Sequence, residues 1–222
     1  MNKLLTCLVI LSLSTLFAAT VLADDFFPPD WRGDILTVLA GWEFDADFTA
    51  DPDNVLPDVF NTIGNGQFEF GDCVTHAHLD SLAWQVDPDD PLNGWVINLD
   101  DMPHIADFVV ANWVDDYEFK HIWIQITWGG QAPPIVTQVI APDPGTGSWT
   151  NPAQATFMTG FDPDPNHHVE YWVLVPNPDC EAIDILLPPG TWLDEVVIDT
   201  ICSQDEVDNE SSSWGQVKAL FR

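Results

Sequence analysis

The stretch "HIWIQIT" (121–127) decides the fold class of this chain. Isoleucine occupies every second position, at 122, 124 and 126. Side chains of a β-strand point alternately to the two faces of the sheet, so this spacing predicts a strand with one apolar face. We expect that face to lie in a core. The positions between the isoleucines form a mixed face of His121, Trp123, Gln125 and Thr127.

A second stretch, "HVEYWVLV" (168–175), alternates in the same way. Its apolar face consists of Val169, Tyr171, Val173 and Val175, opposite a mixed face of His168, Glu170, Trp172 and Leu174. Similar short apolar runs recur along the chain, separated by turn-forming segments such as "DPDDPLNG", "APDPGTGS" and "DPDPN". With 18 prolines and 13 glycines there is little room for long helices. The pattern predicts an all-β single domain, an antiparallel β-sandwich of jelly-roll type.

The two ends of the chain differ in composition from its middle. Residues 1–23 have a lysine, an apolar core and a "VLA" cleavage pattern, which indicate a secretory signal peptide rather than a membrane anchor. We expect the sandwich to occupy 24–202, followed by an acidic serine-rich linker at 203–213. The tail at 214–222 is either a docked or frayed helix or a sorting and anchoring signal. The mature chain is expected to be secreted or on the cell surface, without a transmembrane helix.

Charge restricts the partners. Five lysines and arginines face 36 aspartates and glutamates, which gives a net charge of −31. Binding to nucleic acid needs a basic surface, so this class of partner is excluded, and anionic membranes are disfavoured for the same reason. The acidity suits solubility, cation binding, or both.

Three cysteines remain after the signal peptide: Cys73, Cys180 and Cys202. An exported protein is expected to form a disulfide, and the odd number leaves one thiol. Cys180 and Cys202 end two neighbouring strand-like runs, so we expect them to pair. The two other pairings stay open.

Several segments resemble a group of uncharacterised secreted β-sandwich proteins of environmental bacteria, many of which carry PEP-CTERM-type sorting tails. These segments are "PPDWRGD" (28–34), "GWEFDAD" (41–47), "KHIWIQITWGG" (120–130), "VPNPDCEAIDI" (175–185) and "LDEVVIDTIC" (193–202). The resemblance implies an exported sandwich with a processed or tethered tail, and it implies no activity. The Pro-Glu-Pro motif and the terminal membrane helix of such tails do not follow Cys202.

The stretch "THAHLD" (75–80) raises the possibility of a metal site. His76, His78 and Asp80 share one face of a strand and resemble part of the ligand motif of metallo-β-lactamase-type hydrolases. Ser81 stands where that motif has its last histidine, and the chain offers no helices to flank its sheets. A metal-dependent hydrolase is therefore an alternative to ordinary strand histidines.

Calcium is the other ion that the sequence favours. Oxygen ligands at every second residue suit Ca²⁺, and "FDPDPNH" offers Asp162, Asp164 and Asn166. Comparable acidic loops occur at 45–54 and 87–93. None is an EF-hand, and solvated Asp-Pro turns are the alternative for each loop.

The mixed strand faces suggest a carbohydrate ligand. Indole rings stack on the apolar faces of sugars while neighbouring polar groups bind hydroxyls. If the two strands lie side by side, one patch can hold Trp123, Gln125, His168, Glu170 and Trp172. The alternative is that these tryptophans pack against the opposite sheet or a covering loop.

No nucleophile motif of the Gly-x-Ser-x-Gly type occurs in the chain. The sequence therefore predicts a secreted non-catalytic binding or structural module, with calcium as the candidate stabilising ion. A carbohydrate-binding or carbohydrate-active protein, with polysaccharide or matrix components as partners, is the first alternative.

Overall fold

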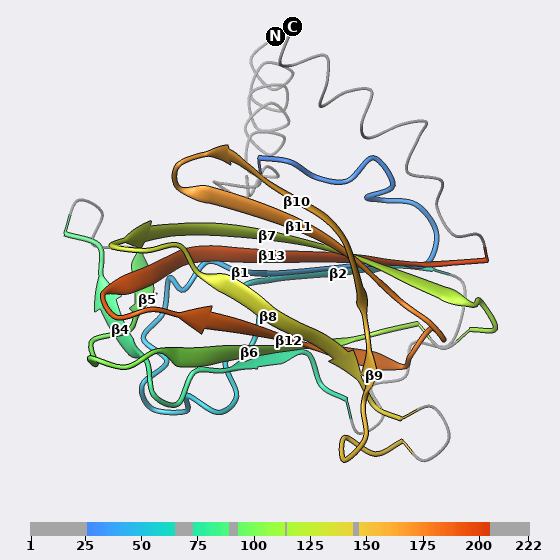
Figure 1. Cartoon of the computed structure of the whole chain (residues 1–222), viewed down its shortest axis with the longest axis horizontal. Helices are drawn as coiled ribbons and strands as arrows, with labels where there is room; N and C mark the ends of the chain where they lie inside the picture. Colours follow the sequence, from blue (N-terminus) through green and yellow to red (C-terminus); the bar gives the residue numbers. More distant parts are fainter. Residues whose placement is uncertain (1–25, 65–72, 89–92, 114, 144–146, 205–222) are drawn as a thin grey trace, which may run out of the picture.

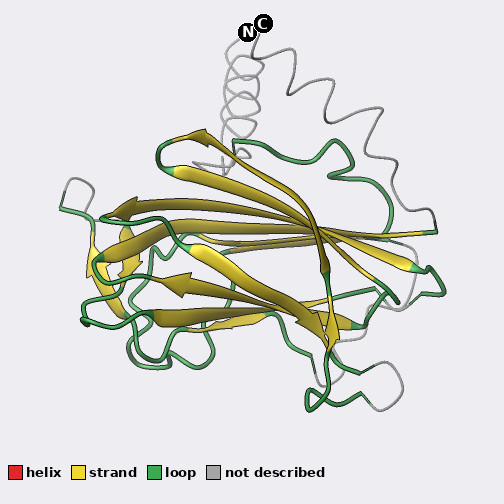
Figure 2. Ribbon diagram, viewed as in Figure 1, coloured by secondary structure: helices red, strands yellow, loops and turns green. Residues whose placement is uncertain are grey.

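The computed structural model describes residues 26–64, 73–88, 93–113, 115–143 and 147–204 of the chain. Two antiparallel sheets stack face to face in this part of the molecule (Figure 1). Over the same residues Figure 2 shows strands and loops but no helix. The predicted all-β sandwich is confirmed.

The larger sheet has the strand order β10-β11-β7-β13-β1-β2, and β5, which also pairs with β4, joins it through β13. Long strands lie at its centre because β7 and β13 are apolar at alternate positions over most of their length. The bounds of its strands are β1 Thr37–Trp42, β2 Val59–Ile63, β4 Ala83–Val86, β5 Gly94–Ile97, β7 Phe119–Gly130, β10 Thr156–Asp164, β11 His167–Leu174 and β13 Thr191–Ser203.

The smaller sheet has the order β3-β6-β12-β8-β9. Its central strand, β12, pairs along its length with β6 and along part of it with β8. The bounds are β3 His76–His78, β6 His104–Ala111, β8 Ile135–Ala141, β9 Ala153–Gln154 and β12 Cys180–Leu187.

The main core lies between the two sheets. The isoleucines of "HIWIQIT" are buried there, as predicted, and they face the apolar side of β12. Trp42 of β1 and Phe108 of β6 meet across the interface with ring centroids 5.0 Å apart. Each fully buried large side chain contributes about 1.5–3 kcal/mol.

A second apolar cluster covers the outer face of the larger sheet. Trp123 packs there with Val169, Tyr171 and Val173, and Phe27 and Trp31 from the N-terminal segment lie over them. Figure 1 shows this segment, in blue, on the side of the larger sheet away from the smaller one. The predicted core face of "HVEYWVLV" therefore lies outside the main core. In β11 it is Trp172 and Leu174 that face inward.

The strand register explains this correction. Tyr171 pairs with Trp123, and Trp172 pairs with Ile122. Directly paired residues of antiparallel strands lie on the same face. Alternation separates the two faces of one strand, but the register decides which of them meets the core.

Three polar contacts fix the N-terminal segment in place. Arg32 forms a two-pronged ion pair with Asp199 of β13, whose side chain is only 1% exposed. The Trp123 indole N–H donates to the Phe27 carbonyl oxygen at 2.8 Å, and the Phe27 N–H donates to Gln125 Oε1 at 2.8 Å. These bonds satisfy polar groups that the segment would otherwise bury without partners.

The predicted Cys180–Cys202 disulfide is wrong: Cys73 bonds to Cys180, with Cα atoms 6.2 Å apart, and Cys202 is the buried free thiol. Cys180 points to the outer side of the smaller sheet, where Cys73 packs. Cys202 points into the main core from the larger sheet. Cys180 and Cys202 thus lie on different sheets, and stacked sheets are about 10 Å apart. Their short separation in the sequence therefore does not bring the two sulfurs together.

The predicted signal peptide, the linker beyond Gln204 and the tail at 214–222 lie outside the described residues. Ser203, assigned to the linker, is the last residue of β13. Within the described part of the chain, no helix has the length and apolar character needed to span a bilayer.

We expect loss of the disulfide to lower the free energy of unfolding by about 2–5 kcal/mol, because it closes a loop with a sequence separation of 107. Urea unfolding of the wild type and of Cys73→Ala, each with and without reductant, measures this. Reductant should destabilise the wild type and leave Cys73→Ala unchanged. Cys202→Ala is the control and should keep the sensitivity; the reverse pattern contradicts the assignment.

Candidate functional site

An uncovered part of the larger sheet forms the best candidate site. β10 is the edge strand of that sheet, and its residues Phe157, Gly160 and Asp162 are exposed. Together with His168, Glu170 and Trp172 of β11 they form a surface that we call the shelf. Trp172 shares its face with the core residue Ile122, so the shelf continues the core-facing side of the sheet beyond the smaller sheet.

An aromatic pair lies at one end of the shelf. Phe157 pairs with Trp172 across the two strands, and the rings meet edge to face with centroids 5.2 Å apart. The Phe157 side chain is 50% exposed. A Cβ at Gly160 would lie 3.3 Å from the Phe157 ring and 3.4 Å from Glu170 Cγ, so glycine leaves room between the aromatic pair and the carboxylate.

A chain of hydrogen bonds crosses the rest of the shelf. His168 Nδ1 lies 2.6 Å from Asp162 Oδ1, and His168 Nε2 lies 2.8 Å from Glu170 Oε1. The Trp172 indole N–H donates to Glu170 Oε2 at 2.7 Å. Glu170 thus has both oxygens occupied and is 8% exposed, whereas the Asp162 side chain is 71% exposed.

The carboxylates favour the charged form of His168. Burial by itself lowers the pKa of His168, but the hydrogen bonds with Glu170 and Asp162 outweigh burial and raise it above its ordinary value. In its charged form, His168 donates to both carboxylates and holds them in place. The shelf can therefore offer an apolar ring, fixed oxygen acceptors and the exposed Asp162 to a ligand that has apolar faces and hydroxyl groups.

The structure brings together three of the five predicted ligand residues. His168, Glu170 and Trp172 lie on the shelf. Trp123 and Gln125 lie on the opposite face of the sheet, 8% and 7% exposed, beneath Phe27. The two strands are neighbours, as the prediction required, but Gln125 pairs with Val169 and not with Glu170. For Trp123 the alternative reading, packing beneath a covering segment, is the one observed.

The three residues predicted for calcium are held separately. Asp162 bonds to His168, while Asp164 bonds to His167 and accepts the Asn166 N–H. These contacts lower the pKa of Asp164, the Asn166 N–H more than the His167 side chain. The Asn166 amide group donates to the Trp128 carbonyl oxygen at 3.0 Å. These hydrogen bonds stabilise the β10–β11 turn.

The histidines of "THAHLD" lie on one face of β3, as the spacing predicted, and their Nε2 atoms are 2.8 Å apart, at hydrogen-bond distance. Asp80 lies in the turn after the strand and does not complete the set. The hydrogen bond between Asp80 and Asp53 raises the pKa of Asp53. Across the described segments, no three His, Cys, Asp or Glu side chains are arranged to hold a metal ion.

Comparison of the chain with known protein families, with curated proteins and with solved structures finds no match.

The sequence did not indicate Phe157 and Gly160 as site residues. The register of β10 against β11 shifts between Phe157 and Thr159, so simple alternation along "TFMTGFD" assigns the wrong faces. Asp162 was singled out, but for calcium. No signal in the strand itself marks the shift, which follows from its pairing with β11.

A row of polar residues crosses the outer face of the smaller sheet, where His78 pairs with Asp107 and Asp107 pairs with Asp184. Burial, followed by the charge of Asp184, raises the pKa of Asp107 to about 6, while His78 acts in the opposite direction. The folded state therefore holds a proton on Asp107 that the unfolded chain releases at lower pH. The stabilisation that this proton gives is fully present below the pKa that Asp107 has in the unfolded chain. It is lost as the pH rises through about 6, the pKa of Asp107 in the folded state.

We expect Asp107→Asn to remove this loss. We compare the unfolding free energy of the variant with that of the wild type at each pH. From about pH 4 to about pH 8 this difference should shift in favour of the variant by roughly 1–2 kcal/mol, after allowance for solvent screening. Urea unfolding at both pH values measures the gain. The control Asp30→Asn removes one exposed charge from the same acidic protein and should show no such difference. Equal pH dependence in Asp107→Asn and the wild type would contradict the assignment.

Proposed function

We propose that this protein is a secreted, non-catalytic binding module that takes a neutral polysaccharide on the shelf. The observation that carries the proposal is the exposed Phe157 ring, packed on Trp172 beside the hydrogen-bonded Glu170–His168–Asp162 chain. Aromatic rings stack on the apolar faces of sugars, and oriented carboxylates accept hydrogen bonds from sugar hydroxyls.

The charge of the protein supports a neutral ligand. A net charge of −31 repels nucleic acids, acidic polysaccharides and anionic membranes. The imidazolium of His168 does not reverse this, because two carboxylates surround it. Neutral sugars bind mainly through stacking and hydrogen bonds, which do not depend on net charge.

The geometry favours binding over hydrolysis. A glycosidase needs one carboxyl that can donate a proton and a second that is free to act as base or nucleophile. Glu170 has both oxygens engaged, by His168 and by Trp172. Asp162 also lies 2.6 Å from His168 Nδ1, so neither carboxyl is left free for the second role.

The extracellular location is part of the proposal and rests on the "VLA" cleavage pattern of residues 1–23. The Cys73–Cys180 disulfide is compatible with an oxidising compartment. The resemblance to secreted sandwich proteins agrees with this location. In this proposal residues 214–222 retain the protein at the cell surface.

Affinity electrophoresis through gels that contain neutral polysaccharides tests the shelf. Phe157→Ala should weaken binding by about tenfold, equivalent to roughly 1.4 kcal/mol, because the stacking ring is lost. The matched control is Phe26→Ala, since Phe26 is 49% exposed and packs on His167 on the other face of the sheet. Its binding should equal that of the wild type.

Each gel is run with and without calcium, because an ion bound elsewhere would affect both variants equally. No retardation of the wild type by any neutral polysaccharide, or equal weakening by both substitutions, would refute the shelf as the binding site.

A further inference from the structure

One end of the sandwich interior contains a buried polar cluster. Lys120 is the second residue of β7, Asn112 directly follows β6, and Glu181 is the second residue of β12. All three are 0% exposed, and Cys202 of β13 is 4% exposed beside them. The whole chain has only five lysines and arginines, so placing one of them in the interior is unusual.

Lys120 lies against the side-chain amide of Asn112. Its Nζ contacts Asn112 Oδ1 and is 3.7 Å from Cys202 Sγ. The amide is oriented by its other bonds, because Oδ1 accepts the Trp113 N–H at 2.7 Å and Nδ2 donates to the Pro178 carbonyl oxygen at 2.7 Å. The amine of Lys120 therefore faces the carbonyl side of a fixed carboxamide.

Glu181 is the third member of the cluster. Neither of its carboxyl oxygens has a hydrogen-bond partner among the described residues, although the side chain is fully buried. Burial raises the pKa of Glu181 to about 7, and the charge of Lys120 acts against this rise. A buried carboxyl without a hydrogen-bond partner favours its protonated form, so Glu181 can carry a proton at this position.

We propose that Lys120 and Asn112 form an intramolecular amide bond, with Glu181 as the proton carrier. The Lys120 Nζ lone pair attacks Asn112 Cγ, so a new C–N bond forms and the bond from Cγ to Nδ2 breaks. Glu181 gives a proton to the departing nitrogen and receives one from Nζ. The products are a secondary amide and one ammonia molecule, and no oxidant or reductant is needed.

The neighbours of the amide suit this reaction. The Trp113 N–H points at Oδ1, where negative charge develops as the amine adds, and such donors stabilise the intermediate. The Cys202 thiol also points at Oδ1 at 3.5 Å, and burial raises its pKa to about 11, so it stays a donor. Fixed proximity of amine and carbonyl supplies the rest of the acceleration.

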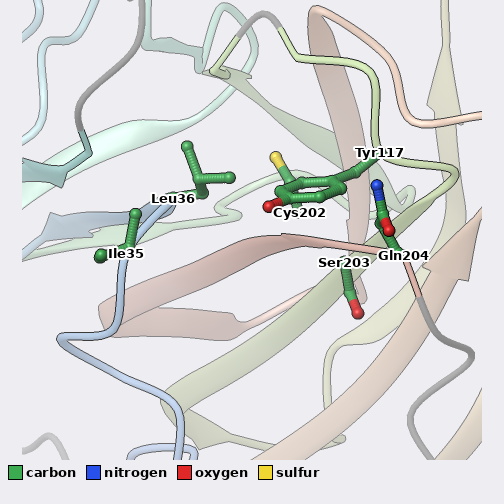
Figure 3. Close-up of a pocket in the computed structure, with 6 residues that line it drawn as sticks. All are labelled: Ile35, Leu36, Tyr117, Cys202, Ser203 and Gln204. Carbon is green, nitrogen blue, oxygen red and sulfur yellow. The ribbon is translucent and has the colours of Figure 1, made fainter.

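An outlet for ammonia lies next to the cluster. A cavity of about 360 Å³ is lined by Cys202 together with Ile35, Leu36, Tyr117, Ser203 and Gln204. Figure 3 shows the Cys202 sulfur beside the Tyr117 ring, with Ile35 and Leu36 on the other side of the cavity. The bond would join β7 of the larger sheet to the end of β6 in the smaller one, next to Ala111, which pairs with the disulfide residue Cys180.

Mass spectrometry of the purified, reduced and denatured wild-type chain tests the proposal directly. We expect its intact mass to be lower than that of its sequence by the mass of one ammonia molecule. Proteolysis after Asp115, Asp116 and Glu118 separates Asn112 from Lys120 in an unlinked chain. In the linked chain the same digestion leaves one branched peptide that contains both residues.

The variants Lys120→Met, Asn112→Ala and Glu181→Gln should each have the full mass of their sequence, with folding verified by circular dichroism. Glu195→Gln, which changes a buried glutamate outside the cluster, is the matched control and should keep the lowered mass. A full mass for the folded wild type would overturn the proposal, as would a lowered mass with two separate peptides, since a cyclised asparagine also loses ammonia. The wild-type measurement decides even if a variant fails to fold.

Discussion

The structure depends on burial of the central strand β7 on both of its faces. From Lys120 to Thr127 every residue is buried, with the isoleucines against the smaller sheet and Trp123 and Gln125 beneath the N-terminal segment. A strand that reads as half polar can be buried in this way only if each polar group finds a partner. Gln125 and Trp123 bond to Phe27, and His121 Nδ1 lies 2.6 Å from the Tyr171 hydroxyl oxygen.

The covering segment decides which surface remains for a ligand. Because residues 26–34 lie on the outer face of the larger sheet, its aromatic side chains are enclosed there. The part of the sheet that stays open is the core-facing side of β10 and β11, beyond the smaller sheet. The larger sheet has more strands than the smaller one, and this difference in size produces the shelf. The edge position of β10 leaves the shelf accessible.

Arg32 and Lys120, the two lysine or arginine residues in the described part of the chain, occupy structural positions. Arg32 fixes the N-terminal segment through Asp199, which is buried, and Lys120 lies inside the sandwich near Glu181. In a protein with 36 acidic residues, Arg32 compensates the charge of a carboxyl that could not be buried alone. The surface is left acidic, which agrees with the neutral ligand that we propose.

Alternation and turn chemistry in the sequence by themselves determined the fold class, a strand at 121–127 and the inward direction of its isoleucines. They also placed His168, Glu170 and Trp172 on one face, because these three residues alternate within a single strand. Only the tertiary structure decided the register of β11 on β7, the shift in β10, the cover over Trp123 and the pairing of Cys73 with Cys180. Local sequence fixes which residues share a face of each strand. Which face packs in the core, and which cysteines form the disulfide, depends on contacts between residues far apart in the chain.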